Sequence, residues 1–387
     1  MPKPKLIRIT TIPLSLEKLL EGQLEYMQDY FEVTAISSEK EHLETLGRER
    51  GYSTYYLEMT RQVTPLSDLK AVLKLYRFLK KESPSIVHTH TPKAGIIGML
   101  ASYLAKVPIR LHTVAGLPLM ETKGKKRKLL NFVEKLTYRF ATKVYPNSKG
   151  LYNFIVDEKF ILPQKLSIIG EGSSNGIDLQ YFNPDVFAAS RNSLRKELNI
   201  PQDSFVFVFV GRLVGDKGIN ELVSAFQNLS RSPLTTHHSS LLLVGSLESE
   251  LDPLNNDTLE AIQTDPNIVS VGFQQDVRPY FTIADALAFP SYREGFPNVV
   301  LQAGAMGLPS IVSNINGCNE IITHKVNGLI IPSKDTKALS DAMRLMMDDE
   351  NLYKQLKSKA RDQIASRYER QRVWDALLEE YESQLKI

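Results

Sequence analysis

The stretch REGFPNVVLQA, residues 293–303, brings together an acid, a flexible turn and the start of a helix. Glu294 can accept hydrogen bonds from sugar hydroxyls, and Gly295 lets the backbone approach a ligand closely. Pro297 fits the first turn of a helix, where unpaired backbone amides favour an anion. These residue types predict a site for a phosphate group with sugar hydroxyls beside it.

A second group of polar residues follows a continuous apolar run in VFVGRLVGDKG, residues 208–218. The run predicts a buried strand that ends at Gly211, so Arg212 and Lys217 leave the sheet at the carboxyl end of the strand. A guanidinium fork and a mobile ammonium can together neutralise a diphosphate without a metal ion. Read alone, the two cations are equally compatible with a solvated loop, but the loop at 293–303 favours the diphosphate site.

The sequence contains no Asp-x-Asp triplet. Hard divalent cations such as Mg²⁺ need oxygen ligands of the kind that paired acids supply. We therefore expect a reaction without a metal site and without another cofactor.

Short apolar strands alternate with amphipathic helical stretches along the whole chain, which predicts an α/β protein with parallel sheets covered by helices on both faces. In the first half the expected strands are 6–10, 33–36, 53–57, 86–90, 109–113, 143–146 and 166–169. In the second half they are 205–210, 240–244, 268–271, 286–289, 310–312 and 329–331.

The chain has 387 residues, more than a single core usually supports. We expect two doubly wound Rossmann-like domains, residues 1–180 and 181–366, joined at a turn-rich hinge around 170–184. They would face each other across a cleft at the carboxyl ends of their strands, where α/β sheets bind ligands. A last helix at 367–387 would pack back over the hinge.

Composition excludes several classes of protein. A net charge of +3 gives no argument for a nucleic-acid partner, and the single cysteine, Cys318, excludes an internal disulfide. The chain starts without a secretory signal, and no apolar run is long enough to span a membrane. We expect a cytoplasmic protein.

Three motifs together resemble the retaining glycosyltransferases of family 4: GRLVGDKG at 211–218, FPSYREGFPNVVLQAGAMGLPSIVS at 289–313, and NGI-D at 175–178. The resemblance covers nearly the whole chain and implies the two-domain GT-B fold. TTIPLSLEKLLEGQ at 10–23, VHTHTPKAG at 87–95 and HTVAGLPLMETKG at 112–124 look most like bacterial enzymes of capsule, exopolysaccharide or lipid-linked glycan synthesis.

The resemblance implies transfer of a hexose or N-acetylhexosamine from a nucleotide-diphosphate sugar, with a UDP-sugar as the expected donor, to a saccharide on a polyprenyl diphosphate. It makes Arg212 and Lys217 the residues that bind the diphosphate, and Glu294 the residue that contacts the donor sugar. These three are the predicted catalytic residues. The predicted donor-binding residues are Gly211, Gly295, Phe296, Pro297, Asn298, Val299 and Gln302.

Gln302 is a departure from the family, which has glutamates eight residues apart, the second of them on the ribose hydroxyls. Replacing a carboxylate by an amide weakens such an anchor by on the order of 1 kcal/mol. We expect Gln302 still to bind the ribose; the alternative is a helix glutamine that faces solvent.

Retaining transfer in this family is described as front-face attack by the acceptor hydroxyl, with the leaving diphosphate taking the proton. The protein then needs no nucleophile. Its task is to orient both substrates and to stabilise charge on the leaving group.

A second departure lies in TVAG, residues 113–116, where many relatives have a histidine and this chain has Ala115. The polar contact of that histidine must then come from elsewhere or be absent. His90 and Lys93 are the preferred cleft residues, because they lie past the carboxyl end of a strand, where an acceptor or a donor could reach them. His88 is interpreted as a core histidine bonded to backbone. For His112 the core and the functional interpretation both stay open.

Two segments point to the acceptor. The loop at 15–23, with Gly22 near its end, lies where the family usually admits it. KGKKRK at 123–128 comes just before an expected helix at 129–139 and could attract an anionic membrane surface. The plainer interpretation of this charge run is a solvated face.

Two other functions fit parts of the pattern. A nucleotide-sugar 2-epimerase on the same fold would need acid and base residues for proton abstraction. This sequence instead has the pattern of residues that bind a nucleotide-sugar donor. A non-catalytic nucleotide or glycan binder is conceivable because of Ala115 and Gln302.

Overall fold

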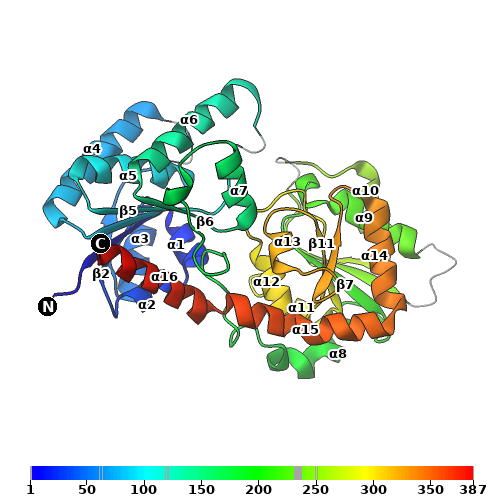
Figure 1. Cartoon of the computed structure of the whole chain (residues 1–387). Helices are drawn as coiled ribbons and strands as arrows, with labels where there is room; N and C mark the ends of the chain where they lie inside the picture. The colour runs from blue at the N-terminus through cyan, green and yellow to red at the C-terminus, as the bar shows by residue number, and fades with distance from the viewer. Residues whose placement is uncertain are drawn as a thin grey trace. The chain divides into compact units, whose positions relative to one another are not determined.

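The computed structural model describes residues 2–60, 62, 64–117, 119, 122–230, 238–248, 250 and 252–386 (Figure 1). The chain forms two compact units, one made of Met1–Gly176 with Arg370–Ile387 and the other of Ile177–Glu369. The chain therefore passes between units at 176/177 and at 369/370, close to the expected 180/181 and 366/367. The last helix belongs to the first unit.

The sheet of the first unit is parallel throughout, with the strand order β3-β2-β1-β4-β5-β6. Order reverses at β1, which pairs with β2 on one side and with β4 on the other. This is the doubly wound arrangement predicted from the alternating pattern. The strands are β1 (Lys5–Ile9), β2 (Glu32–Ser37), β3 (Ser53–Tyr56), β4 (Ile86–His90), β5 (Ile109–Val114) and β6 (Lys143–Pro146).

Helices cover both faces of this sheet (Figure 1). One apolar core lies between the sheet and α4 to α7, and a second lies between the sheet and α1, α2, α3 and α16. The helices of the first unit are α1 (Pro13–Leu19), α2 (Gln23–Met27), α3 (Lys40–Arg50), α4 (Pro65–Glu82), α5 (Pro92–Ala105), α6 (Gly124–Phe140), α7 (Lys149–Asp157) and α16 (Arg370–Leu385).

The second unit repeats this architecture with the strand order β12-β11-β10-β7-β8-β9, again parallel throughout. Strand β7 lies in the middle of the sheet, and its four central residues are fully buried, as the run FVFVFV predicts. The strands are β7 (Phe205–Val210), β8 (Ser239–Val244), β9 (Ile268–Ser270), β10 (Ala286–Phe289), β11 (Ser310–Ser313) and β12 (Gly328–Ile331).

The helices of the second unit include two neighbouring pairs, α9 with α14 and α12 with α15. Short 3₁₀ helices, η3 (Pro184–Ser190) and η4 (Gly215–Lys217), precede two of the α-helices. The α-helices are α8 (Arg191–Glu197), α9 (Ile219–Ser230), α10 (Asn256–Thr264), α11 (Arg278–Ile283), α12 (Asn298–Ala305), α13 (Cys318–Ile321), α14 (Thr336–Asp348) and α15 (Glu350–Tyr368).

Three sequence expectations about elements were wrong. Residues 166–169 form no strand, because Leu166 makes one isolated bridge to Val144 before the chain turns at Gly170. Of residues 15–23, expected as a loop, the first five belong to α1, which starts at Pro13, and Gln23 begins α2. The basic segment 123–128 does not precede its helix: α6 begins at Gly124, since lysine and arginine are good helix formers.

Candidate functional site

Two loops of the second unit leave neighbouring strands at their carboxyl ends. Residues 211–218 follow β7 and residues 290–297 follow β10, and these strands pair side by side. The loops touch at Gly218, whose φ is +72° and where an added Cβ would lie 2.2 Å from the carbonyl oxygen of Pro290. A glycine is therefore needed at 218 to bring the two predicted motifs together.

Lys217 and Glu294 form an ion pair across these loops. The Nζ of Lys217 lies 2.5 Å from the Oε1 of Glu294, and the Oγ of Ser291 donates to the same oxygen at 2.9 Å. Both charged side chains are mostly covered, with 18% and 15% of their surface exposed. The structure thus joins two of the three predicted catalytic residues.

Arg212, the third, also has an acidic partner. Its Nη1 lies 3.3 Å from the Oε2 of Glu248, in the segment that follows β8. The side chain of Arg212 is 46% exposed, so it remains accessible to a ligand. Sequence analysis missed Glu248, although its place after the next strand of the sheet was a signal.

Residues in the turn after β11 stabilise the loop that carries Glu294. The Nδ2 of Asn316 donates to the carbonyl oxygens of Glu294 at 3.1 Å and of Gly295 at 2.7 Å. Gly317, with φ +74°, packs so closely that an added Cβ would lie 2.5 Å from the carbonyl oxygen of Gly295. Asn316 and Gly317 were missed by the sequence analysis, although an Asn-Gly pair after a strand is a turn signal.

A second ion pair stabilises the same loops. The Nη2 of Arg293 lies 2.5 Å from the Oδ2 of Asp216, and the amide of Tyr292 donates to the Asp216 carbonyl oxygen. The hydroxyl of Tyr292 donates to the Oε1 of Glu221 at 2.6 Å, and burial raises the pKa of this phenol. These contacts fix the part of the loop that precedes Glu294.

Helix α12 begins at Asn298, three residues after Gly295. Pro297 is its N-cap, and Asn298, the first helical residue, is exposed. The side chain of Phe296 is 9% exposed and contacts the ring of Tyr368 edge to face, so only its backbone can line a ligand site. Val299 and Gln302 are half-buried, and Gln302 lies one turn after Asn298 on the same side of α12.

In the first unit, the predicted ligand residues are engaged in internal contacts. His90 is 2% exposed, and its Nε2 lies 2.8 Å from the Nη2 of Arg8. Lys93 forms an ion pair with Asp68 at 2.7 Å, and its side chain is 10% exposed. His90 ends β4 and Lys93 lies in the first turn of α5, at the carboxyl end of the strand as expected, and their role as cleft residues stays a prediction.

Arg8, which the sequence analysis did not single out, explains the burial of His90. This fully buried guanidinium also donates to the Tyr381 hydroxyl at 2.7 Å and to the Gln23 Oε1 at 2.5 Å. All three partners are neutral groups, so the cation needs the whole network for solvation. A mid-strand arginine gives no periodic signal in a sequence.

The two other histidines that the sequence analysis considered also belong to the core. His88 binds the Tyr381 hydroxyl at 2.6 Å and the Thr113 hydroxyl at 2.7 Å, so its partners are side chains and not the expected backbone. His112 binds the Thr89 hydroxyl at 2.8 Å. Burial lowers the pKa of His88 and of His90 well below the ordinary range, and that of His112 to about 4. All three imidazoles are therefore neutral.

Gly22 is also a packing position. Its φ is +75°, and an added Cβ would lie 2.7 Å from the ring of Trp374 on α16. Beside it, the Nδ2 of Asn175 donates to the Glu21 carbonyl oxygen, and the Trp374 Nε1 donates to the Asn175 Oδ1. The predicted acceptor loop thus holds the last helix within the first unit.

Comparison with known proteins identifies the family. Two family models match, "Glycosyl transferases group 1" over residues 190–363 and "Glycosyl transferase 4-like" over residues 18–148. The capsular polysaccharide biosynthesis glycosyltransferase CapM of Staphylococcus aureus is 31% identical over 388 residues, covering 100% of this chain and 99% of that protein. The chain belongs to the family 4-like glycosyltransferases.

Two further relatives of this glycosyltransferase are named for lipid-linked substrates. The UDP-Gal:alpha-D-GlcNAc-diphosphoundecaprenol alpha-1,3-galactosyltransferase of Escherichia coli is 32% identical over 364 residues, which are 89% of each chain. An N-acetylgalactosaminyltransferase of Campylobacter jejuni, named for a diphospho-undecaprenol substrate, is 27% identical over 92% of each chain.

Solved structures confirm the GT-B fold of the glycosyltransferase. A glycosyltransferase from Rickettsia africae superposes with a TM-score of 0.82 at 19% identity and covers 100% of both chains. The Anabaena protein HepE, solved in complex with UDP, superposes with a TM-score of 0.79 at 19% identity and covers 98% of this chain and 100% of its own. The predicted fold class is confirmed.

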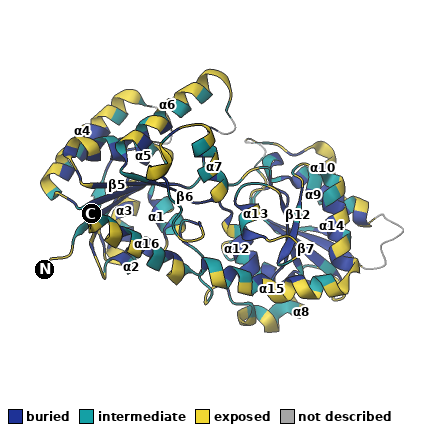
Figure 2. Ribbon diagram, viewed as in Figure 1, coloured by how far each residue is buried: buried dark blue, intermediate teal, exposed yellow. Residues whose placement is uncertain are grey.

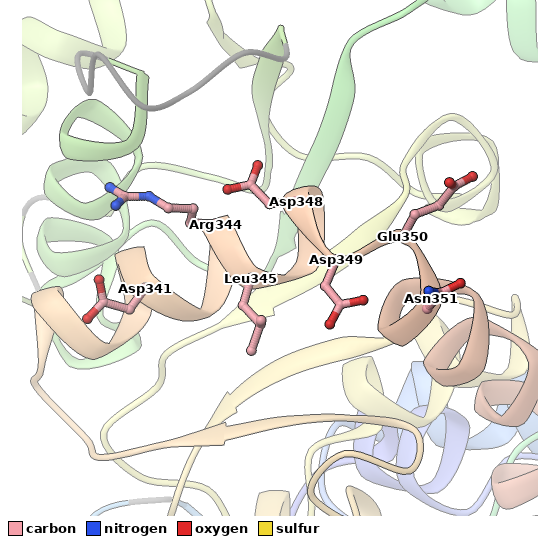
Figure 3. Close-up of a pocket in the computed structure, with 7 residues that line it drawn as sticks. All are labelled: Asp341, Arg344, Leu345, Asp348, Asp349, Glu350 and Asn351. Atoms are coloured by element: carbon pink, nitrogen blue, oxygen red, sulfur yellow. The ribbon is translucent and has the colours of Figure 1, made fainter.

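A surface hollow elsewhere on the glycosyltransferase is distinct from the predicted site (Figure 3). It lies where α14 meets α15 and includes none of the predicted site residues. Its lining is mainly acidic, which does not suit a phosphate: Asp341, Arg344, Leu345, Asp348, Asp349, Glu350 and Asn351.

Among the residues that the structure describes, no group of three or more histidine, cysteine, aspartate or glutamate side chains is arranged to hold a metal ion. No described helix is both long enough and apolar enough to cross a membrane. In the motif 112–124, Pro118, Met120 and Glu121 lie outside the described residues.

Proposed function

We propose that this glycosyltransferase moves a hexose or an N-acetylhexosamine from a UDP-sugar to a lipid-linked saccharide in the synthesis of a cell-surface polysaccharide or glycan. The observation that carries the proposal is the contact between Lys217 and Glu294, at the strand ends where Arg212 also leaves the sheet. Relatives named for UDP-galactose and diphosphoundecaprenol substrates, and for capsular polysaccharide, support this donor and acceptor class.

The ion pairs indicate how a donor would enter. Arg212 and Lys217 exchange the carboxylates of Glu248 and Glu294 for the oxygens of the diphosphate, which carries a higher charge. Glu294, released from Lys217, accepts hydrogen bonds from hydroxyls of the donor sugar. The amides at the start of α12 face phosphate, and Gln302 binds the ribose.

The reaction we propose retains the anomeric configuration. The acceptor oxygen forms a bond to the anomeric carbon on the face from which the bond to the diphosphate oxygen breaks. The acceptor proton passes to that leaving oxygen. Arg212 and Lys217 stabilise the charge that grows on the diphosphate, so the step is proposed to proceed without a metal ion.

We also propose that the enzyme acts at the cytoplasmic face of a membrane. Its basic segment at 123–128 has four exposed lysines, Lys123, Lys125, Lys126 and Lys128. Anionic lipids attract such a segment by about 1 kcal/mol per cation near the surface. An acceptor carried on a polyprenyl diphosphate would be presented at the same surface.

A thermal-shift panel of nucleotide sugars identifies the donor. A ligand at 100 times its dissociation constant stabilises the fold by about 2.7 kcal/mol. We expect the largest shift with a UDP-sugar. A larger shift with a sugar on another nucleotide would overturn the donor assignment.

A transfer assay then tests the reaction with the best donor and a polyprenyl-diphosphate saccharide. We expect a product whose new bond keeps the donor's anomeric configuration, read by NMR, and a rate that EDTA does not change. Epimerised donor in the absence of acceptor would instead identify a 2-epimerase. Donor binding without turnover under all conditions would identify a non-catalytic binder.

A further inference from the structure

Two helices of the first unit expose large apolar side chains. On α4, Leu66, Leu69 and Leu73 are 80%, 57% and 47% exposed. On α6, Leu129 and Phe132 are 47% and 59% exposed. The spacing of three and four residues places the side chains of each helix in one stripe along its outer surface. Figure 2 shows the outward sides of both helices as exposed.

The two stripes lie on the same side of the molecule's first unit. Helix α5 lies between α4 and α6 and contacts both, against one face of the sheet (Figure 1). Each helix is followed by the next parallel strand, so α4 and α6 both begin at the edge where the strands end. The exposed apolar residues lie in the first half of each helix. They therefore lie near the sheet edge at which α/β proteins bind ligands.

The charges around these stripes have a single sign. Asp68 is paired with Lys93, Glu82 with Lys5, and Glu134 is buried, so the acids of both helices are withdrawn from the outer surface. All exposed charged residues of the two helices are cations: Lys70, Lys74, Arg77, Lys80 and Lys81 on α4, and Lys125, Lys126, Lys128, Lys135 and Arg139 on α6.

We propose that the outer face of α4 and α6 docks on an anionic membrane surface. Leu66, Leu69, Leu73, Leu129 and Phe132 enter the boundary between headgroups and acyl chains, while the long lysine and arginine side chains reach the lipid phosphates. This combination of an apolar stripe with flanking cations is the chemistry of helices that lie in a membrane interface.

Charge also decides against a second copy of the chain as the occupant. Two such faces would bring cations opposite cations around the apolar stripe, which disfavours self-association. An anionic lipid surface matches both features at once, because it offers phosphates to the cations and acyl chains to the leucines.

The inference rests partly on the proposed lipid-linked acceptor, because docking through α4 and α6 would bring membrane lipids to the strand-end edge of the first sheet. It goes beyond electrostatic attraction by residues 123–128, since it assigns α4 as a second contact and its leucines as inserting residues. A contact with an apolar part should keep some affinity at high salt, whereas a purely electrostatic one is screened.

Vesicle flotation without donor or acceptor tests the surface independently of catalysis. We expect wild-type protein to bind phosphatidylcholine vesicles that contain phosphatidylglycerol and to bind pure phosphatidylcholine far less. The triple variant Leu66→Gln, Leu69→Gln, Leu73→Gln should lower the partition coefficient on the order of tenfold or more. Its melting temperature should not fall, because the three side chains are already exposed and glutamine is a good helix former.

The matched control is Leu162→Gln, at a leucine of the same unit that is 70% exposed but lies outside α4 and α6. This control should bind vesicles as the wild type does. Wild-type affinity in the triple variant, or no preference of the wild type for phosphatidylglycerol, would overturn the proposal.

A depth measurement gives a second, independent readout. The variant Leu69→Trp places an indole in the stripe, and Trp374 on α16, against the opposite core of the sheet, is an internal reference. With a lipid brominated on its acyl chain, we expect no quenching of Trp374 fluorescence in the wild type. In Leu69→Trp we expect the fluorescence of the added tryptophan to be quenched. Vesicle binding without additional quenching would show that another surface docks. Transfer activity that fails while vesicle binding and quenching persist would contradict the proposed function and leave this surface intact.

Discussion

The ammonium of Lys217 lies 2.5 Å from the carboxylate of Glu294, although the two residues are 77 positions apart in the chain. Both leave neighbouring parallel strands at the same edge, and Ser291 fixes the carboxylate by a further hydrogen bond. The ion pair keeps a cation and an acid in position in the absence of substrate. In the proposed function a bound diphosphate takes the place of Glu294 beside Lys217, so the cation is already near the leaving group before the reaction.

Removing the cation should therefore reduce turnover more than stability. We expect Lys217→Ala to lower kcat on the order of 100-fold, because charge on the leaving diphosphate loses a donor. The control is Lys337→Ala, at a lysine of the same unit whose side chain is 86% exposed. Steady-state kinetics and a melting curve check the prediction, and an unchanged kcat in Lys217→Ala would refute the assigned role.

Glu248 should compete with the donor diphosphate for Arg212, since its carboxylate lies 3.3 Å from the guanidinium. We expect Glu248→Gln to tighten nucleotide-diphosphate binding by a few fold, because an exposed ion pair of this kind is worth about 0–1 kcal/mol. Isothermal titration with the nucleoside diphosphate measures the effect. Weaker binding in Glu248→Gln would instead show that the carboxylate contacts the ligand directly.

Gly317 should be intolerant of a side chain. Its φ of +74° is unfavourable for other residues, and a Cβ would lie 2.5 Å from the carbonyl oxygen of Gly295. We expect Gly317→Ala to cost about 1–3 kcal/mol of unfolding free energy and to lower turnover by displacing Glu294. Denaturant unfolding checks the first effect and kinetics the second.

Gly307→Ala is the matched control for this substitution. Gly307 also has a positive φ, +79°, but an added Cβ there would meet no atom within 4 Å. Comparing the two variants separates the stability lost through the positive φ, which both share, from the stability lost through the close contact, which only Gly317→Ala has. Equal losses of turnover in both variants would argue against a positioning role for Gly317.

The sequence predicted the loops at 211–218 and 290–297 well because their signals are local. The apolar run of β7, the glycine at 211 and the proline at 297 each fix structure within a few residues. Parallel pairing then brings the strand ends together without further information. The local signals predicted the two loops, and the family resemblance assigned Lys217 and Glu294 to one site.

The first unit was harder to predict because its decisive contacts join distant residues. Arg8 meets Tyr381 and His90 across 373 and 82 positions, and these contacts turn a strand-end histidine into a core residue. Asn316, in the turn between β11 and α13, donates to the carbonyl oxygen of Glu294, 22 positions earlier in the chain. Periodicity reports which face of an element is buried, but it does not report which partner a buried polar group finds.

The buried histidines predict a loss of stability in acid. Burial lowers the pKa of His112 to about 4, and lowers that of His88 and His90 further. The unfolded chain takes up protons near pH 6.5, so it binds more protons than the folded state below that pH. The stability from these groups is complete above about pH 6.5 and declines as the pH falls toward about 4.

Denaturant unfolding at about pH 7.5 and about pH 5 measures this effect. We expect a loss on the order of 2 kcal/mol for each histidine that stays neutral in the fold. His238→Gln, at an exposed side chain, is the control and should leave the pH dependence unchanged. Equal free energies of unfolding at the two pH values would contradict the prediction.

Gln302 offers the sharpest test of the donor site, because it differs from the family's glutamate by a single group. It lies one turn into α12, on the side of Asn298, where a ribose would follow the diphosphate. If its amide binds the ribose, Gln302→Ala should weaken donor binding, and Gln302→Glu should strengthen it by about 1 kcal/mol, or roughly fivefold. Titration with the nucleoside diphosphate and with inorganic diphosphate separates ribose from phosphate binding, since only the first should respond. A dissociation constant for the nucleoside diphosphate that neither variant changes would place Gln302 outside the site.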